Sequence, residues 1–366
     1  MRILYLTGQL ISHGGIEKIL SLKLNYFAEQ TKHEVFLSTY EQVNNPFVYE
    51  LSDKVNYVDL DINYNVDYTK ESLYSKRCLR LLPKHIYRTW LLIKKIKPDV
   101  IIIPNFGYEY WFLPFIKRQS RIIREFHDSQ YLRKKQNRIK LFIDNLIQRL
   151  YDAVVVLTPE EVNYFDFKAN IKVIPNPIVS SNMQAPLSHK KVLSVGRIDR
   201  VKCFEDFILI AKKVIAHCPE CCFEVYGTGN EVYIAELKSK VENLDLCAHL
   251  KFMGTFHPIQ EKMCEASVYV CTSKTESFGL TLVEALDVGV PVVSYDSPHG
   301  PRNIISNGID GYLISLGDVS DASEKIISLL EDENKRKKMG QNARENMTRF
   351  HINEIVKLWE ALFLGR

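Results

Sequence analysis

The chain has 366 residues, of which 46% are hydrophobic and 25% charged, and its formal net charge is +4. This composition is typical of a globular protein and argues against disorder, and the length fits two domains of roughly 150 to 200 residues each. No apolar run approaches the ~20 residues that cross a bilayer. The charge is uneven, because residues 70–140 hold 18 Lys and Arg against 5 Asp and Glu.

The chain opens with an apolar run at residues 2–6, which we interpret as a first buried strand. It carries one charge, lacks a small-residue cleavage site and leads straight into a glycine-containing loop, so it does not resemble a signal peptide. The eight cysteines fit a reducing compartment, since several lie inside predicted strands or helices. We therefore expect a cytoplasmic protein.

Strand-like apolar runs alternate with amphipathic stretches along the whole chain. This alternation predicts an α/β protein in which each half forms a doubly wound parallel sheet with helices on both faces. In the first half the predicted strands are 2–6, 34–39, 55–59, 99–103, 121–126 and 153–157; in the second half they are 191–195, 222–226, 250–253, 267–272, 290–295 and 311–314.

The loop after the first strand contains Gly14 and Gly15. Tandem glycines let the backbone approach a ligand closely, and their N–H groups can bind phosphate, although such a pair also marks ordinary tight turns.

Residues 79–97 and 132–150 alternate cations with apolar residues and predict two basic amphipathic helices. They suit the surface of an anionic membrane that carries a lipid-linked acceptor, and ordinary solvated helices are the alternative. Nucleic acid is not expected as a partner, because no nucleic-acid-binding module accompanies the charge.

His127 lies where the predicted strand 121–126 ends, so its imidazole is expected to face a ligand cleft. A lone histidine is more often structural. Asp128 follows it and is a weaker candidate for contact with an acceptor. Beyond the first half, the proline-rich and polar stretch 174–188 predicts the interdomain linker.

Arg197 and Lys202 lie on the loop after the strand 191–195. Two cations at a strand-to-helix junction could neutralise a diphosphate that gains charge as its sugar departs, in place of a metal ion. The alternative is an exposed basic loop.

Gly227 and Gly229 look like half of a dinucleotide fingerprint, but Val232 stands where its third glycine belongs. We interpret the two glycines as making room for a nucleotide. Thr255 and Phe256, after the next strand, are expected to lie against its base.

Residues 276–284 place two carboxylates, Glu276 and Glu284, on either side of a predicted helix start near Gly279. The free N–H groups and the positive end of a helix dipole favour an anion there. The acids could then grip hydroxyls on opposite sides of a pyrophosphate, as in a nucleotide sugar. The alternative is a solvated loop acid and an exposed helix residue.

At this point the chain resembles the retaining glycosyltransferases of family four, which have the GT-B fold and carry a Glu-x7-Glu motif. Further matches are the Gly-Arg-x4-Lys segment, in which Cys203 replaces a following glycine, and the Ile-Pro-Asn segment that ends at Asn176. The resemblance extends over most of the chain. It implies two facing Rossmann-like domains, residues 1–178 and 179–349, with a helix within 350–366 crossing back to the first domain.

The resemblance also implies roles for single residues. Glu276 and His127 would contact the donor sugar, and Glu284 the ribose. The backbone of Phe278, Gly279 and Leu280 would bind the diphosphate. The remaining residues placed by this likeness in or near the substrate site are Glu17, two positions after the glycine pair, and Asn176.

The segment 296–305 resembles the Asp-x-Pro-x-Gly-Pro motif of a subgroup that transfers hexoses or N-acetylhexosamines from UDP, with Asn303 where many relatives have glutamate. We therefore expect a metal-independent, retaining transferase that needs no cofactor beyond its UDP-sugar substrate. A saccharide or lipid-linked acceptor would bind the N-terminal domain, and surface polysaccharide or glycoconjugate synthesis would be its setting. The enzyme could also lie on the inner face of the membrane. Its oligomeric state is not predicted.

Three alternatives remain. A nucleotide-sugar epimerase or a sugar phosphorylase could share the fold, and a noncatalytic membrane-associated scaffold would bind no UDP-sugar. A dinucleotide oxidoreductase is disfavoured by Val232.

Overall fold

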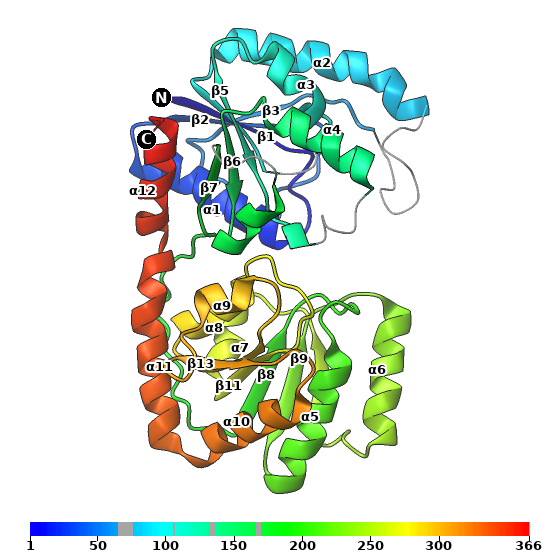
Figure 1. Cartoon of the computed structure of the whole chain (residues 1–366), viewed down its shortest axis with the longest axis vertical. Coiled ribbons are helices and arrows are strands. Elements are labelled where there is room, and N and C mark those ends of the chain that lie inside the picture. Colours follow the sequence, from blue (N-terminus) through cyan, green and yellow to red (C-terminus); the bar gives the residue numbers. More distant parts are fainter. Residues whose placement is uncertain (65–75, 105–106, 132–136, 166–169, 366) are drawn as a thin grey trace. The chain divides into compact units, whose positions relative to one another are not determined.

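The computed structural model describes residues 1–64, 76–104, 107–131, 137–165 and 170–365. The chain forms two compact units, shown in Figure 1. Unit 1 comprises Met1–Pro177 and Ile355–Arg366, and unit 2 comprises Ile178–Glu354.

Unit 1 is built on a parallel sheet of seven strands within the described residues, in the order β3-β2-β1-β4-β5-β6-β7. Central strands such as β1 and β4 are buried apolar runs, as expected for a sheet that helices cover on both faces. The strands are β1 Arg2–Leu6, β2 Glu34–Thr39, β3 Asn56–Asp59, β4 Val100–Ile103, β5 Arg121–Glu125, β6 Ala153–Val156 and β7 Ile171–Val173. The helices are α1 Gly15–Gln30, α2 Lys76–Ile96, α3 Glu109–Ile116, α4 Arg138–Gln148 and the 3-10 turn η2 Pro159–Tyr164.

Unit 2 repeats this plan with six parallel strands within the described residues, in the order β10-β9-β8-β11-β12-β13. Its strands are β8 Lys191–Val195, β9 Cys222–Tyr226, β10 Leu250–Gly254, β11 Val268–Cys271, β12 Val292–Tyr295 and β13 Gly311–Ile314. Its helices are α5 Phe204–His217, α6 Glu231–Asn243, α7 Ile259–Cys264, α8 Leu280–Asp287, α9 Gly300–Ile304, α10 Val319–Glu331, α11 Glu333–Met347 and the turn η3 Thr348–Phe350. In both sheets successive strands are added first on one side of the first strand (β1 or β8) and then on its other side, which is the doubly wound arrangement.

The last helix, α12 Ile352–Phe363, joins unit 1 from Ile355 onward. Figure 1 shows it beside α1, where the rings of Phe27 and Phe363 lie 5.5 Å apart. The Trp359 ring lies 4.3 Å from Nζ of Lys23, also on α1. The chain passes from unit 2 back to unit 1 after residue 350, because Phe350 is still buried within unit 2, where it packs against Phe278.

The predicted fold class, α/β with two doubly wound parallel sheets, is confirmed. Every predicted strand is present, and no strand end is shifted by more than two residues. The edge strand β7 was not predicted, because three residues are too few to show an alternating or continuous apolar pattern.

Candidate active site

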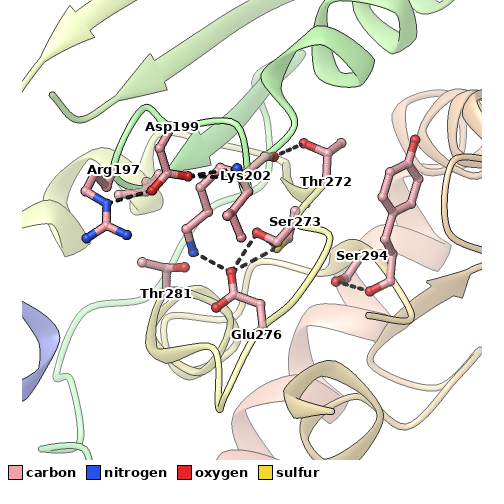
Figure 2. A network of polar contacts seen from close by, with 12 residues as sticks. Arg197, Asp199, Lys202, Thr272, Ser273, Glu276, Thr281 and Ser294 are labelled. Carbon is pink, nitrogen blue, oxygen red and sulfur yellow. Dashed lines mark hydrogen bonds and ion pairs between the residues drawn. The ribbon is translucent and has the colours of Figure 1, made fainter. Parts of the chain in front are cut away.

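The loops after β8 and β11 hold Lys202 and Glu276. These two strands pair side by side where the strand order of unit 2 reverses, and open α/β sheets bind ligands outside the carboxyl ends of such strands. Nζ of Lys202 donates a hydrogen bond to Oε1 of Glu276, and Oγ of Ser273 donates to the same oxygen over 2.6 Å (Figure 2). Residues from two distant loops therefore form one polar cluster.

This cluster is mostly shielded from water. The side chain of Lys202 is 24% exposed and that of Glu276 is 12% exposed. Burial by itself lowers the pKa of Lys202, but Glu276, together with Cys271 and Asp199, outweighs that effect, so the pKa lies above its ordinary value. Lys202 is therefore a fixed cation at neutral pH, and Glu276 compensates its charge.

Asp199 organises the cationic loop and was not singled out from the sequence. Its Oδ1 accepts from the backbone N–H groups of Val201 and Lys202 over 3.1 and 3.2 Å, while Oδ2 accepts from Nε of Arg197 over 2.7 Å. Thr272 Oγ1 donates to the Lys202 carbonyl over 2.9 Å and ties this loop to the end of β11 (Figure 2). An aspartate that accepts hydrogen bonds from N–H groups two and three positions later in the chain forms a local turn. The turn-forming role of Asp199 could therefore have been predicted from the sequence.

Arg197 and Lys202 differ in their surroundings. The side chain of Arg197 is 77% exposed and contacts Asp199, whereas Lys202 points toward Glu276. Cys203, which caps α5, adopts a left-handed backbone with φ +52°. Glycine adopts that conformation without strain, which is a physical reason for the glycine in the motif that this segment resembles.

The helix α8 begins directly after the loop of Glu276. Gly279 precedes it with φ +104°, a conformation that favours glycine, and α8 starts at Leu280 as predicted. Tyr269 Oη lies 3.1 Å from the Val195 carbonyl and 2.8 Å from Thr281 Oγ1, so β8 and the first turn of α8 are joined through one buried phenol. The positive end of the α8 dipole thus lies in the same loop region as the Lys202–Glu276 pair.

Phe278 and Glu284 occupy the flanks of this junction. The ring of Phe278 is 2% exposed and packs edge-on against Phe350, so its backbone is the part that remains for a ligand. Glu284 is only 7% exposed, which excludes the alternative of an exposed helix residue.

The segment between β12 and α9 supports the loop of Glu276. The backbone N–H of Glu276 donates to the Pro298 carbonyl over 3.0 Å, and its carbonyl accepts from the N–H groups of His299 and Gly300 over 2.8 and 3.0 Å. A Cβ on Gly300 would lie 1.9 Å from the Phe278 carbonyl oxygen. The motif that suggested a UDP-sugar donor therefore also fixes the backbone of the candidate sugar-binding acid.

Gly227 and Gly229 follow β9 and pack against the loop after β8. A Cβ on Gly227 would lie 1.9 Å from the carbonyl oxygen of Gly196, and one on Gly229 would lie 2.0 Å from that of Ile198. In the structure these two glycines allow the neighbouring backbone that carries Arg197 to come close. Their predicted contact with a nucleotide stays a prediction.

This packing predicts unequal costs for two matched substitutions. Gly227 and Gly254 end neighbouring strands and both have positive φ, but only Gly227 has backbone in the path of a Cβ. Gly254→Ala is expected to cost about 1–2 kcal/mol for left-handed strain. Gly227→Ala is expected to cost about 1–3 kcal/mol more, because it adds overpacking. Thermal unfolding followed by circular dichroism measures both, and equal losses would show that the close approach of the loops is unimportant.

Thr255 and Phe256 follow β10 at the same edge of the sheet. Phe256 is 38% exposed, its ring lies 6.4 Å from that of Tyr226, and Nζ of Lys262 lies 4.8 Å from its centre. An exposed ring beside a cation is able to stack on a planar base.

In unit 1, Gly14 precedes α1, and Gly15 is its first residue. Glu17 turns back over this loop: its Oε1 accepts a hydrogen bond from Ser12 Oγ, and a Cβ on Gly14 would lie 2.1 Å from its Oε2. The predicted loop, with the acid beside its glycines, is therefore present.

His127 belongs to a buried charge network rather than an open loop. Its side chain is 4% exposed, and Nε2 lies 3.3 Å from Oε1 of Glu125. Nζ of Lys23 lies 2.5 and 2.6 Å from the two oxygens of Glu125. From the sequence the imidazole is expected to face a cleft. Lys23 and Glu125 were not predicted as neighbours of His127, because their pairing depends on contact between α1 and β5.

The loop after His127 is anchored by a buried glutamate. The buried Glu161 accepts a hydrogen bond from the backbone N–H of Gln130 over 3.1 Å, and burial raises the pKa of Glu161 to about 7 although this and other backbone N–H groups oppose the shift. Asp128 is exposed in this loop, whereas Asn176 is buried at the end of unit 1. The predicted cleft between the two domains stays a prediction.

Among the described residues, no group of three His, Cys, Asp or Glu side chains is arranged to hold a metal ion. In the same part of the chain no helix combines the length and apolar composition that crossing a bilayer requires.

Comparison with known proteins finds a family model that matches part of the chain. Residues 180–346 match the model for glycosyl transferases group 1. An exopolysaccharide phosphotransferase of Streptomyces coelicolor is 31% identical over 219 residues, which cover 58% of this chain but 23% of that protein. The chain spans between 32% and 45% of the length of three further curated relatives.

Among the matches that extend over nearly the whole chain are one curated relative and one solved structure. An α-1,4-N-acetyl-D-galactosaminyltransferase of Campylobacter jejuni, named for a diphospho-undecaprenol-linked saccharide, is 26% identical over 98% of this chain and 97% of its own. The crystal structure of S. aureus TarM with fondaparinux, α-GlcNAc-glycerol and UDP covers 99% of both chains with a TM-score of 0.81 at 15% identity, which shows a shared fold. Residues 180–346, the part that matches the model for glycosyl transferases group 1, form most of unit 2.

Proposed function

We propose that this protein is a metal-independent, retaining glycosyltransferase of family four. It would transfer a hexose or N-acetylhexosamine from a UDP-sugar to a glycan or a lipid-linked saccharide. The observation that carries the proposal is the contact between Lys202 and Glu276 at the carboxyl ends of β8 and β11, next to the start of α8. A cation, a carboxylate and free helix N–H groups in one place match the phosphates and hydroxyls of a nucleotide sugar.

Each group has a separate task in this proposal. Lys202 and the first N–H groups of α8 bind the diphosphate and stabilise the charge that it gains as the sugar leaves. Among the described residues Oε2 of Glu276 accepts no hydrogen bond, because the contacts of this carboxylate fall on Oε1. That second oxygen is therefore available for a sugar hydroxyl. Glu284 would hold the ribose, and exposed Arg197 would add positive charge.

The reaction breaks the bond between the sugar C1 and the β-phosphate oxygen and forms a bond from C1 to the acceptor oxygen. We propose that the acceptor attacks from the face that UDP leaves, which retains the configuration at C1. The proton of the acceptor hydroxyl then passes to the departing phosphate oxygen. This route needs no covalent intermediate with a protein side chain.

The relatives support the donor and the acceptor classes. The Campylobacter jejuni relative is named as an N-acetylgalactosaminyltransferase for a lipid-linked saccharide, and the TarM structure contains UDP. By this analogy the acceptor binds unit 1, where the loops of Gly14 and His127 lie. A cytoplasmic enzyme on the inner face of the membrane would meet such an acceptor.

Nucleotide-sugar binding and turnover test the proposal. The full chain is mixed with UDP-, GDP- or ADP-sugars and its melting temperature is measured, since a ligand at 100 times its Kd stabilises the folded state by about 2.7 kcal/mol. We expect an increase with a UDP-hexose or UDP-N-acetylhexosamine. We also expect UDP to be released only when an acceptor is present, and this release should persist in EDTA. NMR of the product should show that the C1–O bond is still axial, as in the donor.

Other results would favour other functions. A melting shift with GDP-mannose alone would contradict the UDP assignment. A requirement for inorganic phosphate would indicate a phosphorylase. Conversion of the donor without lasting release of UDP would indicate an epimerase. A melting temperature that no nucleotide sugar changes would favour the noncatalytic scaffold.

A further inference from the structure

The helix α4 of unit 1 presents its apolar face outward. Its exposed residues recur with helical spacing: Ile139 is 70% exposed, Phe142 63%, Ile143 44% and Leu146 46%, and Leu150 just beyond the helix is 45% exposed. Its buried residues are instead polar, namely Asp144, Asn145 and Gln148. An ordinary surface helix buries the apolar side, so α4 is inverted.

A buried polar network fixes this orientation. Tyr110 Oη donates to Oδ1 of Asp144 over 2.5 Å, and Gln148 Nε2 donates to Oδ2 over 2.7 Å. The Arg124 guanidinium, which has no exposed surface, lies 4.9 Å from the Tyr110 ring and interacts electrostatically with Asp144. Rotating α4 to bury its apolar residues would leave these groups unpaired, and the cost of unpaired buried polar groups opposes that rotation.

An apolar pocket of about 590 Å³ lies beside this face. Its walls come from α2, α4 and the region of α3, and are formed by Leu79, Leu82, Tyr108, Trp111, Ile139 and Ile143 together with Asn137 and Lys140. Figure 1 shows these three helices together in unit 1. A volume of this size is in the range of ligand pockets, and walls of this composition suit a hydrocarbon chain.

Positive charge surrounds the apolar surface. Arg77 and Arg80 are exposed on either side of Leu79, and Arg138 and Lys140 are exposed on either side of Ile139. The sequence of α2 contains no acidic residue, and the single acid of α4 is the buried Asp144. Apolar side chains beside cations, on two helices whose described residues include no exposed acid, complement an anionic lipid surface, whereas a protein partner would need a matching acidic and apolar patch.

We propose that α2 and α4 form a docking face for an anionic phospholipid bilayer, and that the pocket between them takes one hydrocarbon chain of a bilayer lipid. The docking face is defined by Leu79, Ile139, Phe142, Ile143, Leu146 and the four cations beside them. The inference gives a physical basis to the proposed membrane location, but it depends on neither donor binding nor turnover.

Sedimentation of the full-length protein with vesicles tests the docking face. We expect binding to phosphatidylcholine vesicles that contain phosphatidylglycerol and weak binding without it. Changing Arg77, Arg80, Arg138 and Lys140 together to glutamine is expected to lower the partition coefficient by about 100-fold or more, because each cation near an anionic surface contributes about fivefold. High salt should act in the same direction.

The apolar contribution has its own matched variants. Ile139→Ser/Phe142→Ser/Leu146→Ser should lower binding by at least about tenfold, because these side chains enter the interface. The control Val232→Ser/Ile309→Ser/Leu316→Ser removes similarly exposed residues from unit 2 and should bind as the parent does. Both triple variants should keep the parent melting temperature and its shift with UDP-sugar, which separates loss of docking from failure of the proposed function.

The pocket is tested with phosphatidylglycerol brominated on its chains, which quenches nearby tryptophan fluorescence. Trp111 lines the pocket, so quenching should be strong in the parent and largely lost in Trp111→Phe. Quenching unchanged in Trp111→Phe would contradict chain entry. Vesicle binding that is indifferent to phosphatidylglycerol, or a dimer that the α4 variant dissociates without any vesicle binding, would overturn the docking face.

Discussion

Replacing Lys202 by methionine is expected to lower kcat by about 100- to 1000-fold, the usual loss when a preorganised group that stabilises developing charge is removed. Nζ of Lys202 contacts Glu276 in the shielded cluster after β8 and β11, where a cation acts more strongly than in open water. Glu276→Gln keeps the shape of the acid but removes its charge, and a loss of similar size is expected if the sugar hydroxyl is bound by the carboxylate.

Arg200→Gln is the matched control for the cationic loop. Arg200 lies two positions before Lys202, is 67% exposed, and pairs with Glu236 on α6 rather than with Glu276. Its kcat should stay within about twofold of the parent, because exposed ion pairs contribute little. Steady-state kinetics with the UDP-sugar identified by the melting screen measures all three variants. If Lys202→Met turned over as fast as Arg200→Gln while remaining folded, the cluster would have no role in the chemistry.

The second large effect concerns the stability of unit 1. Lys23→Met leaves the carboxylate of Glu125 buried without its main partner, and breaking a buried pair in this way costs about 3–5 kcal/mol. Lys23→Met/Glu125→Leu removes both charges and should recover most of that loss. Lys32→Met, at an exposed site beyond the end of α1, should change stability by less than about 0.5 kcal/mol.

Tryptophan fluorescence during denaturant unfolding follows unit 1 selectively, because the three tryptophans, Trp90, Trp111 and Trp359, all belong to it. A loss below about 1 kcal/mol in Lys23→Met would show that Glu125 finds compensation elsewhere. If the double variant did not regain the lost free energy of unfolding, the two residues would support the fold by shape rather than by charge.

The same pair predicts a dependence on acid. Burial by itself raises the pKa of Glu125, but Lys23 and His127 outweigh it and lower the pKa to about 2 from an ordinary 4.5. The stabilisation is therefore complete above about pH 4.5 and is lost as the pH falls toward 2, since the unfolded chain takes up the proton first. The parent should show this loss, and Lys23→Met should show less of it.

Sequence periodicity was sufficient for the architecture. Alternating apolar runs and amphipathic stretches predicted the two parallel sheets, and the glycine before Leu280 predicted the start of α8. These features depend on neighbours within a few residues, whose preferences for strand, turn or helix are encoded locally. The short edge strand β7 was missed because its pattern is too brief.

The candidate site was only partly visible in the sequence. Lys202 and Glu276 were identified separately, but their contact depends on β8 and β11 lying side by side, although β9 and β10 intervene in the chain. The partners of His127 were missed for the same reason, since Lys23 is on α1 and Glu125 on β5. The close packing of the glycines after β9 against the loop that carries Arg197 was likewise not visible in the sequence.

By itself the sequence determined the class of fold, the order of its elements and the residue types that could bind a charged sugar nucleotide, because these follow from local pattern and composition. Only the tertiary structure decided which charges meet and which helix faces stay exposed. The inverted α4 shows why: its amphipathic pattern alone predicts that the apolar face is buried, and the opposite orientation depends on the distant groups Tyr110 and Arg124 that interact with Asp144.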